Sequence, residues 1–212
     1  MKTGFQRYAD VFAALDFPVE LNIEKGIQHF GAGQTLAFPK KQNVIWVGIA
    51  PFAKHAAKMY PLDKMAEVKD ILIKQPGIQI LVFASRDEAG ILSTWEKESD
   101  RIIITAGKTD FKAELQLISA LDVMISMDSA NMHLASLAGV PVISVWGGTH
   151  PFLGFYGWGQ DIKNAVQTDL PCRPSSVFGN KECPVHGAAG CMQEITPQMI
   201  AGRSLEVLKI TH

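Results

Sequence analysis

The sequence predicts an α/β fold, a doubly wound, Rossmann-like parallel sheet, and two observations carry that prediction. Short, continuously apolar runs are typical of strands buried on both faces of a sheet, and they cover residues 44–49, 78–84, 102–105, 123–126 and 142–146. Amphipathic segments of helical length separate these runs, at residues 62–74, 87–98, 111–121 and 129–138. Strand–helix–strand repetition with short connections favours right-handed crossovers, and hence a parallel sheet with helices on both faces.

The two ends of the chain differ from this repeating core. Residues 1–42 contain one predicted helix (5–15), a short predicted strand (19–23) and a glycine-rich connector, so we interpret them as the end of a preceding domain and a linker. Residues 43–195 form the predicted Rossmann-like domain, in which the glycine- and proline-rich stretch from residue 151 onward indicates long ordered loops. Thr196 and Pro197 are typical of an N-cap and a first helical position, which predicts a C-terminal helix over 196–212.

Composition excludes several classes of protein. Among 212 residues there are 20 Lys and Arg and 21 Asp and Glu, so the chain lacks the positive electrostatic field that attracts nucleic acids or anionic membranes. The longest nearly uninterrupted apolar stretch, residues 44–53, is half as long as the roughly 20-residue span that a transmembrane helix needs. The N-terminus lacks a signal-peptide core, and three cysteines do not form a disulfide framework. We therefore expect a cytoplasmic protein.

In a doubly wound sheet, ligands bind beyond the carboxyl ends of the strands, where the strand order reverses. The turn after the fourth predicted strand ends in Asp128, and Ser129 and Ala130 then open a helix. Small side chains let a phosphate reach the first free N–H groups of that helix, and His133 follows one turn later. A second interpretation has equal weight, in which Asp128 or Ser129 only caps the helix and His133 is a surface residue.

The other strand–helix turns carry weaker signals. Lys54 and Lys58 follow the first strand and could neutralise a diphosphate, or they form a solvated basic loop. Glu88 follows the second strand and could bind a ribose diol, or it complements the helix dipole. The loop around Thr109, after the third strand, could turn its backbone toward a base, or Thr109 caps a helix.

Two later segments also contain candidate site residues. Gly148 and Thr149 follow the fifth predicted strand, where paired glycines allow a ligand to approach the backbone or permit a tight turn. Further along are three cysteines and a histidine, which include a Cys-x-x-His pair: Cys172, Cys183, His186 and Cys191. Their outer spacings are irregular, so the pattern favours free thiols packing a loop over a metal site.

Taken together, the order and spacing of these residues resemble glycosyltransferase family 9, the ADP-heptose:lipopolysaccharide heptosyltransferase type. The family pattern Asp-Ser/Thr-Gly-x-x-His-Leu-Ala, with a proline and a Gly-x-Thr-x-Pro turn after it, is matched at residues 128–135, 141 and 147–151. Its upstream Pro-Gly-x5-Lys-x-Trp-Pro motif is echoed by Pro51, Lys58, Tyr60 and Pro61. Its Gly-x-x-x-Glu turn is echoed at residues 84–88, and its closing Cys-Met-x-x-Ile at residues 191–195.

The resemblance implies the C-terminal, donor-binding half of a GT-B fold, with residues 43–195 as the nucleotide-sugar domain. By resemblance, Lys58 holds the diphosphate, Glu88 the ribose and the backbone near Thr109 the adenine, while Asp128 contacts the transferred sugar. The site is completed at the phosphates by Ser129, Ala130 and His133, with Lys54, Gly148 and Thr149 as further candidates. The family's N-terminal domain supplies the acceptor site and the general base, so we expect no catalytic base in this chain and little transfer by it alone.

Further expectations follow from the same resemblance. The expected partners are an ADP-linked nucleotide-sugar donor and a lipopolysaccharide core acceptor, which the other domain would hold. No nucleic acid partner is expected. The full enzyme could associate peripherally with the inner membrane. No cofactor and no metal are expected, because the loops lack an Asp-x-Asp pair. Ala130 replaces a family glycine and Ser175 a family cysteine, so the donor's identity stays open. The alternatives are a non-catalytic nucleotide-sugar-binding module and a GT-B-like nucleotide-sugar epimerase.

Overall fold

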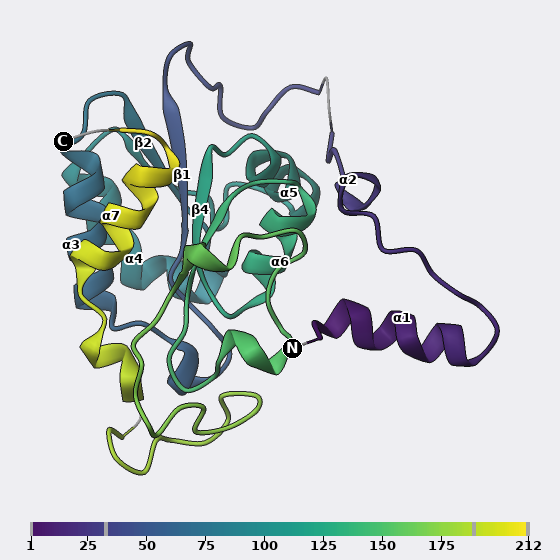
Figure 1. The fold of residues 1–212 in the computed structure, drawn as a ribbon. Helices are drawn as coiled ribbons and strands as arrows, with labels where there is room; N and C mark the ends of the chain where they lie inside the picture. The colour runs from purple at the N-terminus through teal and green to yellow at the C-terminus, as the bar shows by residue number, and fades with distance from the viewer. Residues whose placement is uncertain (1, 32–33, 188–189, 211–212) are drawn as a thin grey trace.

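The computed structural model describes residues 2–31, 34–187 and 190–210, and its centre is a sheet of six parallel strands (Figure 1). The strands are β1 (Ile45–Ala50), β2 (Ile78–Val82), β3 (Ile102–Ile104), β4 (Val123–Met127), β5 (Val142–Val145) and β6 (Ala165–Val166). They lie in the order β3-β2-β1-β4-β5-β6, and every neighbouring pair is parallel. The predicted doubly wound parallel sheet is confirmed.

Helices cover both faces of this sheet. One face is covered by α3 (Leu62–Ile73), α4 (Arg86–Glu98) and α7 (Pro197–Val207), and the other by α5 (Phe111–Ser119) and α6 (Ala130–Leu137). Outside these layers lie α1 (Gly4–Ala14) and α2 (Ile23–Gly26) (Figure 1). Short 3-10 segments in the connections are η1 (Ala56–Lys58), η2 (Pro151–Leu153), η3 (Ile162–Asn164) and η4 (Gly190–Glu194).

Alternation along the strands divides the core into two layers. In β1, Val47 and Ile49 pack under α3, α4 and α7, whereas Trp46 and Ala50 pack under α5 and α6. These four side chains are at most 1% exposed. Burial on both faces explains why the strands are continuously apolar and not alternating.

Two predicted elements at the ends of the chain differ from the structure. The strand predicted over 19–23 is wrong, because residues 19–22 have no strand beside them and Ile23 opens α2. The Asn22 side chain accepts a hydrogen bond from the Lys25 N–H, which starts a helical turn there. The edge strand β6 is only two residues long and lies in the stretch interpreted as loop. The helix predicted over 196–212 starts as expected, with Thr196 as its N-cap, but ends at Val207, and residues 211 and 212 lie outside the described residues.

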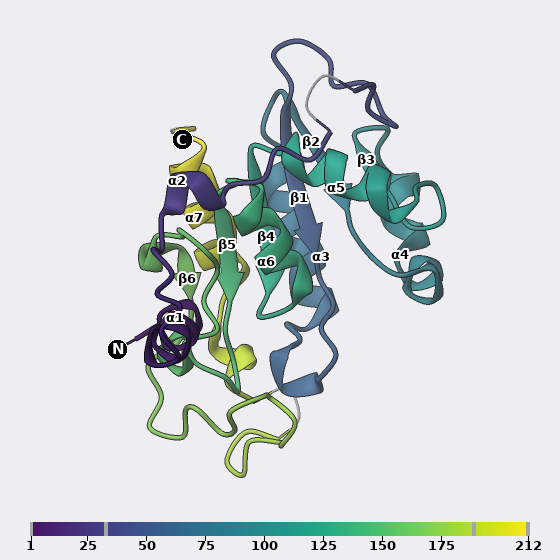
Figure 2. The ribbon, with the colours of Figure 1, turned by 90° about the vertical axis from the view of Figure 1, so that its right-hand side faces the viewer.

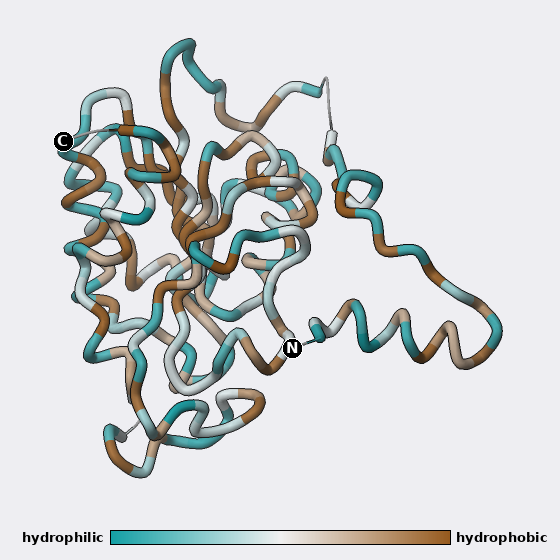
Figure 3. The backbone as a smooth tube through the Cα atoms, viewed as in Figure 1, coloured by the Kyte–Doolittle hydropathy of each residue, from teal (hydrophilic) through white to brown (hydrophobic). Residues whose placement is uncertain are grey.

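The N-terminal arm, residues 2–31, runs along the β6 side of the molecule (Figure 2). It is attached where the Gly4 N–H donates to the Gly154 carbonyl at 2.7 Å and where Phe5 meets Trp158 edge-on. Hydrophobic residues are spread along this arm although it projects from the body (Figure 3); exposed examples are Tyr8, Val11, Phe12, Leu15 and Phe17. Of the helices that the structure describes, none is long and apolar enough to cross a membrane.

Candidate functional site

A cleft of about 590 Å³ opens at the carboxyl ends of β1, β2 and β4. From β1 the chain crosses to β2 on one side, and from β4 it crosses to β5 on the other side. The two connections therefore run in opposite directions and leave a crevice between them. Residues from all three following turns line the cleft, and among the predicted site residues these are Lys54, Lys58, Glu88, Asp128, Ser129 and Ala130. Turns that are distant in sequence therefore form a single site.

An ion pair lies in this cleft. Lys58 Nζ is 2.8 Å from Asp128 Oδ2, and the side chains are 15% and 4% exposed. The fully buried Thr149 hydroxyl donates to the same carboxylate oxygen at 2.9 Å. A buried carboxylate requires such partners, because an unpaired charge away from water is costly. The pair places a cation and a hydrogen-bond acceptor side by side in the cleft.

Close backbone packing positions Lys58. The Gly148 N–H donates to the Ala57 carbonyl at 2.8 Å, which holds η1 against the turn after β5. A Cβ on Gly148 would lie 2.8 Å from the Ala57 Cβ and 2.9 Å from Ser175 Oγ. Gly148 and Thr149 therefore support the cleft from behind and do not line it.

The amino terminus of α6 faces the cleft without a side-chain cap. Ser129, its N-cap residue, makes no capping bond, and its Oγ lies 3.2 Å from Ser126 Oγ. At the corresponding turn before α5, the Asp110 side chain accepts from the Ala113 N–H. Uncapped N–H groups at the positive end of a helix dipole favour an anion.

His133 lies one turn into α6, half-buried beside this ion pair. Burial lowers its pKa, the Asp128 charge opposes that shift, and the Lys58 charge adds to it. Histidine normally titrates just below neutral pH, so a lowered pKa leaves the ring neutral at pH 7. His133 can therefore offer a hydrogen bond but not a positive charge. It is not among the residues that line the cleft.

Two glutamates border the cleft. Glu88 Oε2 accepts a hydrogen bond from the Ser85 N–H at 2.8 Å and closes a capping box at the start of α4. Glu88 therefore lies in the first turn of α4, where its charge complements the helix dipole as one of the two interpretations predicts. Glu114, in the first turn of α5, has its pKa raised by burial. Sequence reasoning missed Glu114, although it lies in the first turn of the helix after β3, as Glu88 lies in the first turn of the helix after β2.

Comparison with known proteins decides the family. The sequence model of "Glycosyltransferase family 9 (heptosyltransferase)" matches residues 4–186, which is most of the chain. The chain belongs to glycosyltransferase family 9.

Curated relatives of this family 9 chain support the same assignment. Lipooligosaccharide heptosyltransferase 2 of Campylobacter jejuni subsp. jejuni serotype O:2 is 30% identical over 105 residues, which are 50% of this chain and 31% of the relative. Lipopolysaccharide heptosyltransferase 3 of Escherichia coli (strain K12) is 32% identical over 127 residues, 58% of this chain and 35% of the relative. The matched segments thus span about a third of these relatives' own lengths.

Solved structures show that the fold is shared. The E. coli ADP-heptose LPS heptosyltransferase II superposes with a TM-score of 0.61 at 20% identity, covering 80% of this chain and 48% of that one. A family 9 glycosyltransferase from Veillonella parvula DSM 2008 gives a TM-score of 0.68 at 14% identity, covering 100% of this chain and 61% of that one. The parallel sheet with its flanking helices is therefore the glycosyltransferase fold.

Among the remaining predicted residues of this family 9 chain, Thr109 lies outside the cleft lining, and its hydroxyl donates to the Thr105 carbonyl at 3.2 Å. Phe178, which sequence reasoning missed, lines the cleft from the loop after β6. Beside it, Gly179 has a φ of +71°, and a Cβ there would lie 2.6 Å from Lys58 Cγ. Because loops lack periodicity, only the tertiary structure reveals that this loop reaches Lys58.

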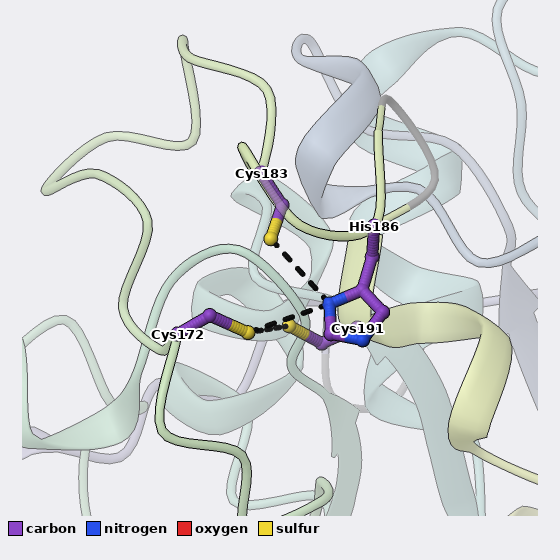
Figure 4. Close-up of side chains that lie close together, drawn as sticks. All are labelled: Cys172, Cys183, His186 and Cys191. Atoms are coloured by element: carbon purple, nitrogen blue, oxygen red, sulfur yellow. Dashed lines mark hydrogen bonds between the residues drawn. The ribbon is translucent and has the colours of Figure 1, made fainter.

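The same loop carries the cysteines, all of which are free thiols. Burial raises the pKa of Cys183, but hydrogen bonds from His186 and from the backbone outweigh burial and lower it to about 6. Burial, together with the neighbouring Cys172, raises the pKa of Cys191 to about 12. The ligand atoms of Cys172, Cys183, His186 and Cys191 lie within 4.8 Å of one another (Figure 4).

Proposed function

We propose that the cleft binds the nucleotide-sugar donor of a heptosyltransferase, with ADP-heptose as the donor, for transfer to a lipopolysaccharide core. The observation that carries the proposal is the Lys58–Asp128 pair beside the uncapped amino terminus of α6. Family 9 membership supports sugar transfer, and relatives named as ADP-heptose and lipopolysaccharide enzymes support this choice of donor and acceptor.

In this proposal, Lys58 and α6 stabilise the departing diphosphate. When the sugar leaves, negative charge develops on the phosphate oxygens, and groups fixed in advance around that charge lower the barrier. Lys58 is largely shielded from water, so its attraction for the diphosphate is stronger than that of an exposed lysine. Ala130 and Asn131 also line the cleft, and we propose that their N–H groups contribute two further donors.

Asp128 is assigned a different role, as an acceptor for a hydroxyl of the transferred sugar. Its partners Lys58 and Thr149 hold the carboxylate in one orientation. Glu88 is proposed to bind the ribose, and Glu114, which also lines the cleft, is proposed to share that task. The adenine then extends toward the backbone near Thr109. The neutral ring of His133 supports the phosphate side as a hydrogen-bonding group.

We propose further that a second domain supplies the acceptor site and the general base. The chain spans about half the length of the heptosyltransferase II structure, and the apolar face of α1 is exposed. Such a face fits burial against another domain. Transfer by residues 1–212 alone is accordingly expected to be weak.

Thermal unfolding with ADP, UDP, GDP and their sugar conjugates tests donor binding. A ligand at about 100 times its Kd adds about 2.7 kcal/mol to stability, which raises Tm by roughly 5–10 °C for a domain of this size. We expect this shift with ADP-linked ligands and its loss in Lys58→Ala. The matched control is Lys64→Ala, which removes a lysine on α3 whose amine donates to the Gln193 carbonyl outside the cleft.

The outcomes separate the candidate functions. No shift with any nucleotide would contradict the donor site. Binding without transfer in a two-domain relative carrying this domain would favour a non-catalytic binding module. Conversion of a nucleotide sugar without any acceptor would favour an epimerase.

A further inference from the structure

A second cluster of reactive side chains lies apart from the donor cleft, in the loop between β6 and α7. Cys172, Cys183, His186 and Cys191 point toward a common centre in Figure 4, and their potential ligand atoms are all within 4.8 Å of one another. Their irregular sequence spacing favoured separate free thiols. The folded loop instead brings all four together.

Three of the distances within the cluster are close to those of a metal-centred tetrahedron. Cys172 Sγ lies 3.6 Å from Cys191 Sγ and 3.4 Å from His186 Nδ1, and Cys183 Sγ lies 3.6 Å from the same nitrogen. Four ligands around zinc, with Zn–S bonds of about 2.3 Å, are separated by roughly 3.8 Å. The three measured edges are therefore within a few tenths of an ångström of those a bound ion requires.

Two of the four ligands come from one tight turn. Cys183 and Gly187 are joined by backbone hydrogen bonds in both directions, at 2.9 and 3.3 Å, and Gly187 has a left-handed φ of +71°. Such a turn holds the thiol and the imidazole on one side. Its Cys-x-x-His spacing lies within the short range of structural zinc sites.

A half-buried cation beside the cluster, Arg173, balances its charge. Three thiolates, one neutral imidazole and a divalent ion carry a net charge of −1. The guanidinium of Arg173 interacts electrostatically with the Cys172 and Cys191 sulfurs. It also donates to the carbonyls of Gly147 and Thr149, at 2.6 and 3.0 Å, which ties the cluster to the turn that supports Asp128.

We propose that Cys172, Cys183, His186 and Cys191 form a structural metal site of the tetrahedral thiolate–imidazole class, which takes zinc or iron. Binding releases the thiol protons to solvent, and no redox step is involved. All four positions are filled by protein, so the ion holds the loop and does not act on substrate. The loop carries Phe178 and Gly179 against Lys58, so the ion also stabilises one wall of the donor cleft.

Metal analysis of the full chain tests this site directly. The protein is purified under reducing conditions without a chelator, and its zinc and iron contents are measured by mass spectrometry. We expect about one ion per chain. Cys183→Ser should lose metal affinity by at least the roughly 10- to 100-fold that the loss of an outer-shell partner costs. His186→Cys retains four ligands and should keep the ion, as should His29→Ala, which removes an exposed histidine elsewhere.

Two results would overturn the site. One is a wild-type chain that contains only trace metal and, after reduction, does not take up added Zn²⁺. The other is an unchanged metal content in Cys183→Ser, checked for folding by circular dichroism. Nucleotide binding is measured separately, so metal retention without ADP binding would refute the donor site and leave this inference in place.

Discussion

Lys58 Nζ and Asp128 Oδ2 come from the turns after β1 and β4 and lie 2.8 Å apart in the cleft at the end of the sheet. Because β1 and β4 are hydrogen-bonded neighbours, with Ala50 opposite Ser126, their carboxyl ends place the following turns side by side. The sheet order therefore creates the pair, which in the proposed function supplies both a cation for a diphosphate and an oriented carboxylate.

The pair should also stabilise the fold. Lys58→Met leaves a carboxylate that is 4% exposed without its cation, and we expect a loss of about 3 kcal/mol in the free energy of unfolding. Replacing both residues, as in Lys58→Met with Asp128→Leu, should cost less than the sum of the two single changes, because no charge is left unpaired. Urea denaturation of the four proteins measures this coupling. Additive effects would show that the residues do not interact.

Thr149 should matter through its hydroxyl alone. Thr149→Val keeps the side chain's shape but removes the hydrogen bond to Asp128, and bonds to charged groups contribute about 1.5–3 kcal/mol. We expect a loss in that range, measured by urea denaturation, together with weaker ADP binding, measured by calorimetry. The control is Thr94→Val, on the exposed surface of α4. Equal effects of the two substitutions would refute a specific role for Thr149.

Gly148 should tolerate no side chain. The added Cβ of Gly148→Ala would meet Ala57 Cβ at 2.8 Å and Ala57 O at 3.1 Å, so η1 must move and Lys58 with it. Overpacking of this kind costs about 1–3 kcal/mol, and ADP affinity should fall as well. Gly90→Ala, at an exposed position of α4 with no atom within 4 Å of the new Cβ, should instead stabilise by roughly 0.5–1 kcal/mol. Thermal unfolding compares the two variants.

His133 should make stability depend on pH. Burial lowers its pKa in the folded chain, so below the unfolded value of about 6.5 the unfolded chain binds more protons. Stability is then lost as pH falls from about 6.5 through the folded pKa, while above that window the ring is neutral in both states. His133→Gln should flatten this part of the profile, measured by urea denaturation at pH 5–8. An unchanged slope would mean that His133 is not the group responsible.

Much of the fold follows from local pattern. The apolar run predicted over 44–49 is β1, and the amphipathic segment predicted over 62–74 is α3, each within about one residue of its observed ends. The cap at Thr196 starts α7 as expected. These features depend on neighbours in the chain, so composition and spacing suffice to predict them. The two-residue edge strand β6 and the turn at Asn22 carry too little pattern to be recognised.

The position of the cleft could also be predicted, because a doubly wound sheet directs its strand ends to one edge. The tertiary structure alone decided which side chains meet there. Glu114 and Phe178 reach the cleft from elements whose relative placement depends on packing across the sheet. Likewise, Cys172 and His186 meet because the loop folds back on itself. Periodicity reports which face of an element is buried, whereas distances between side chains depend on how all the elements pack.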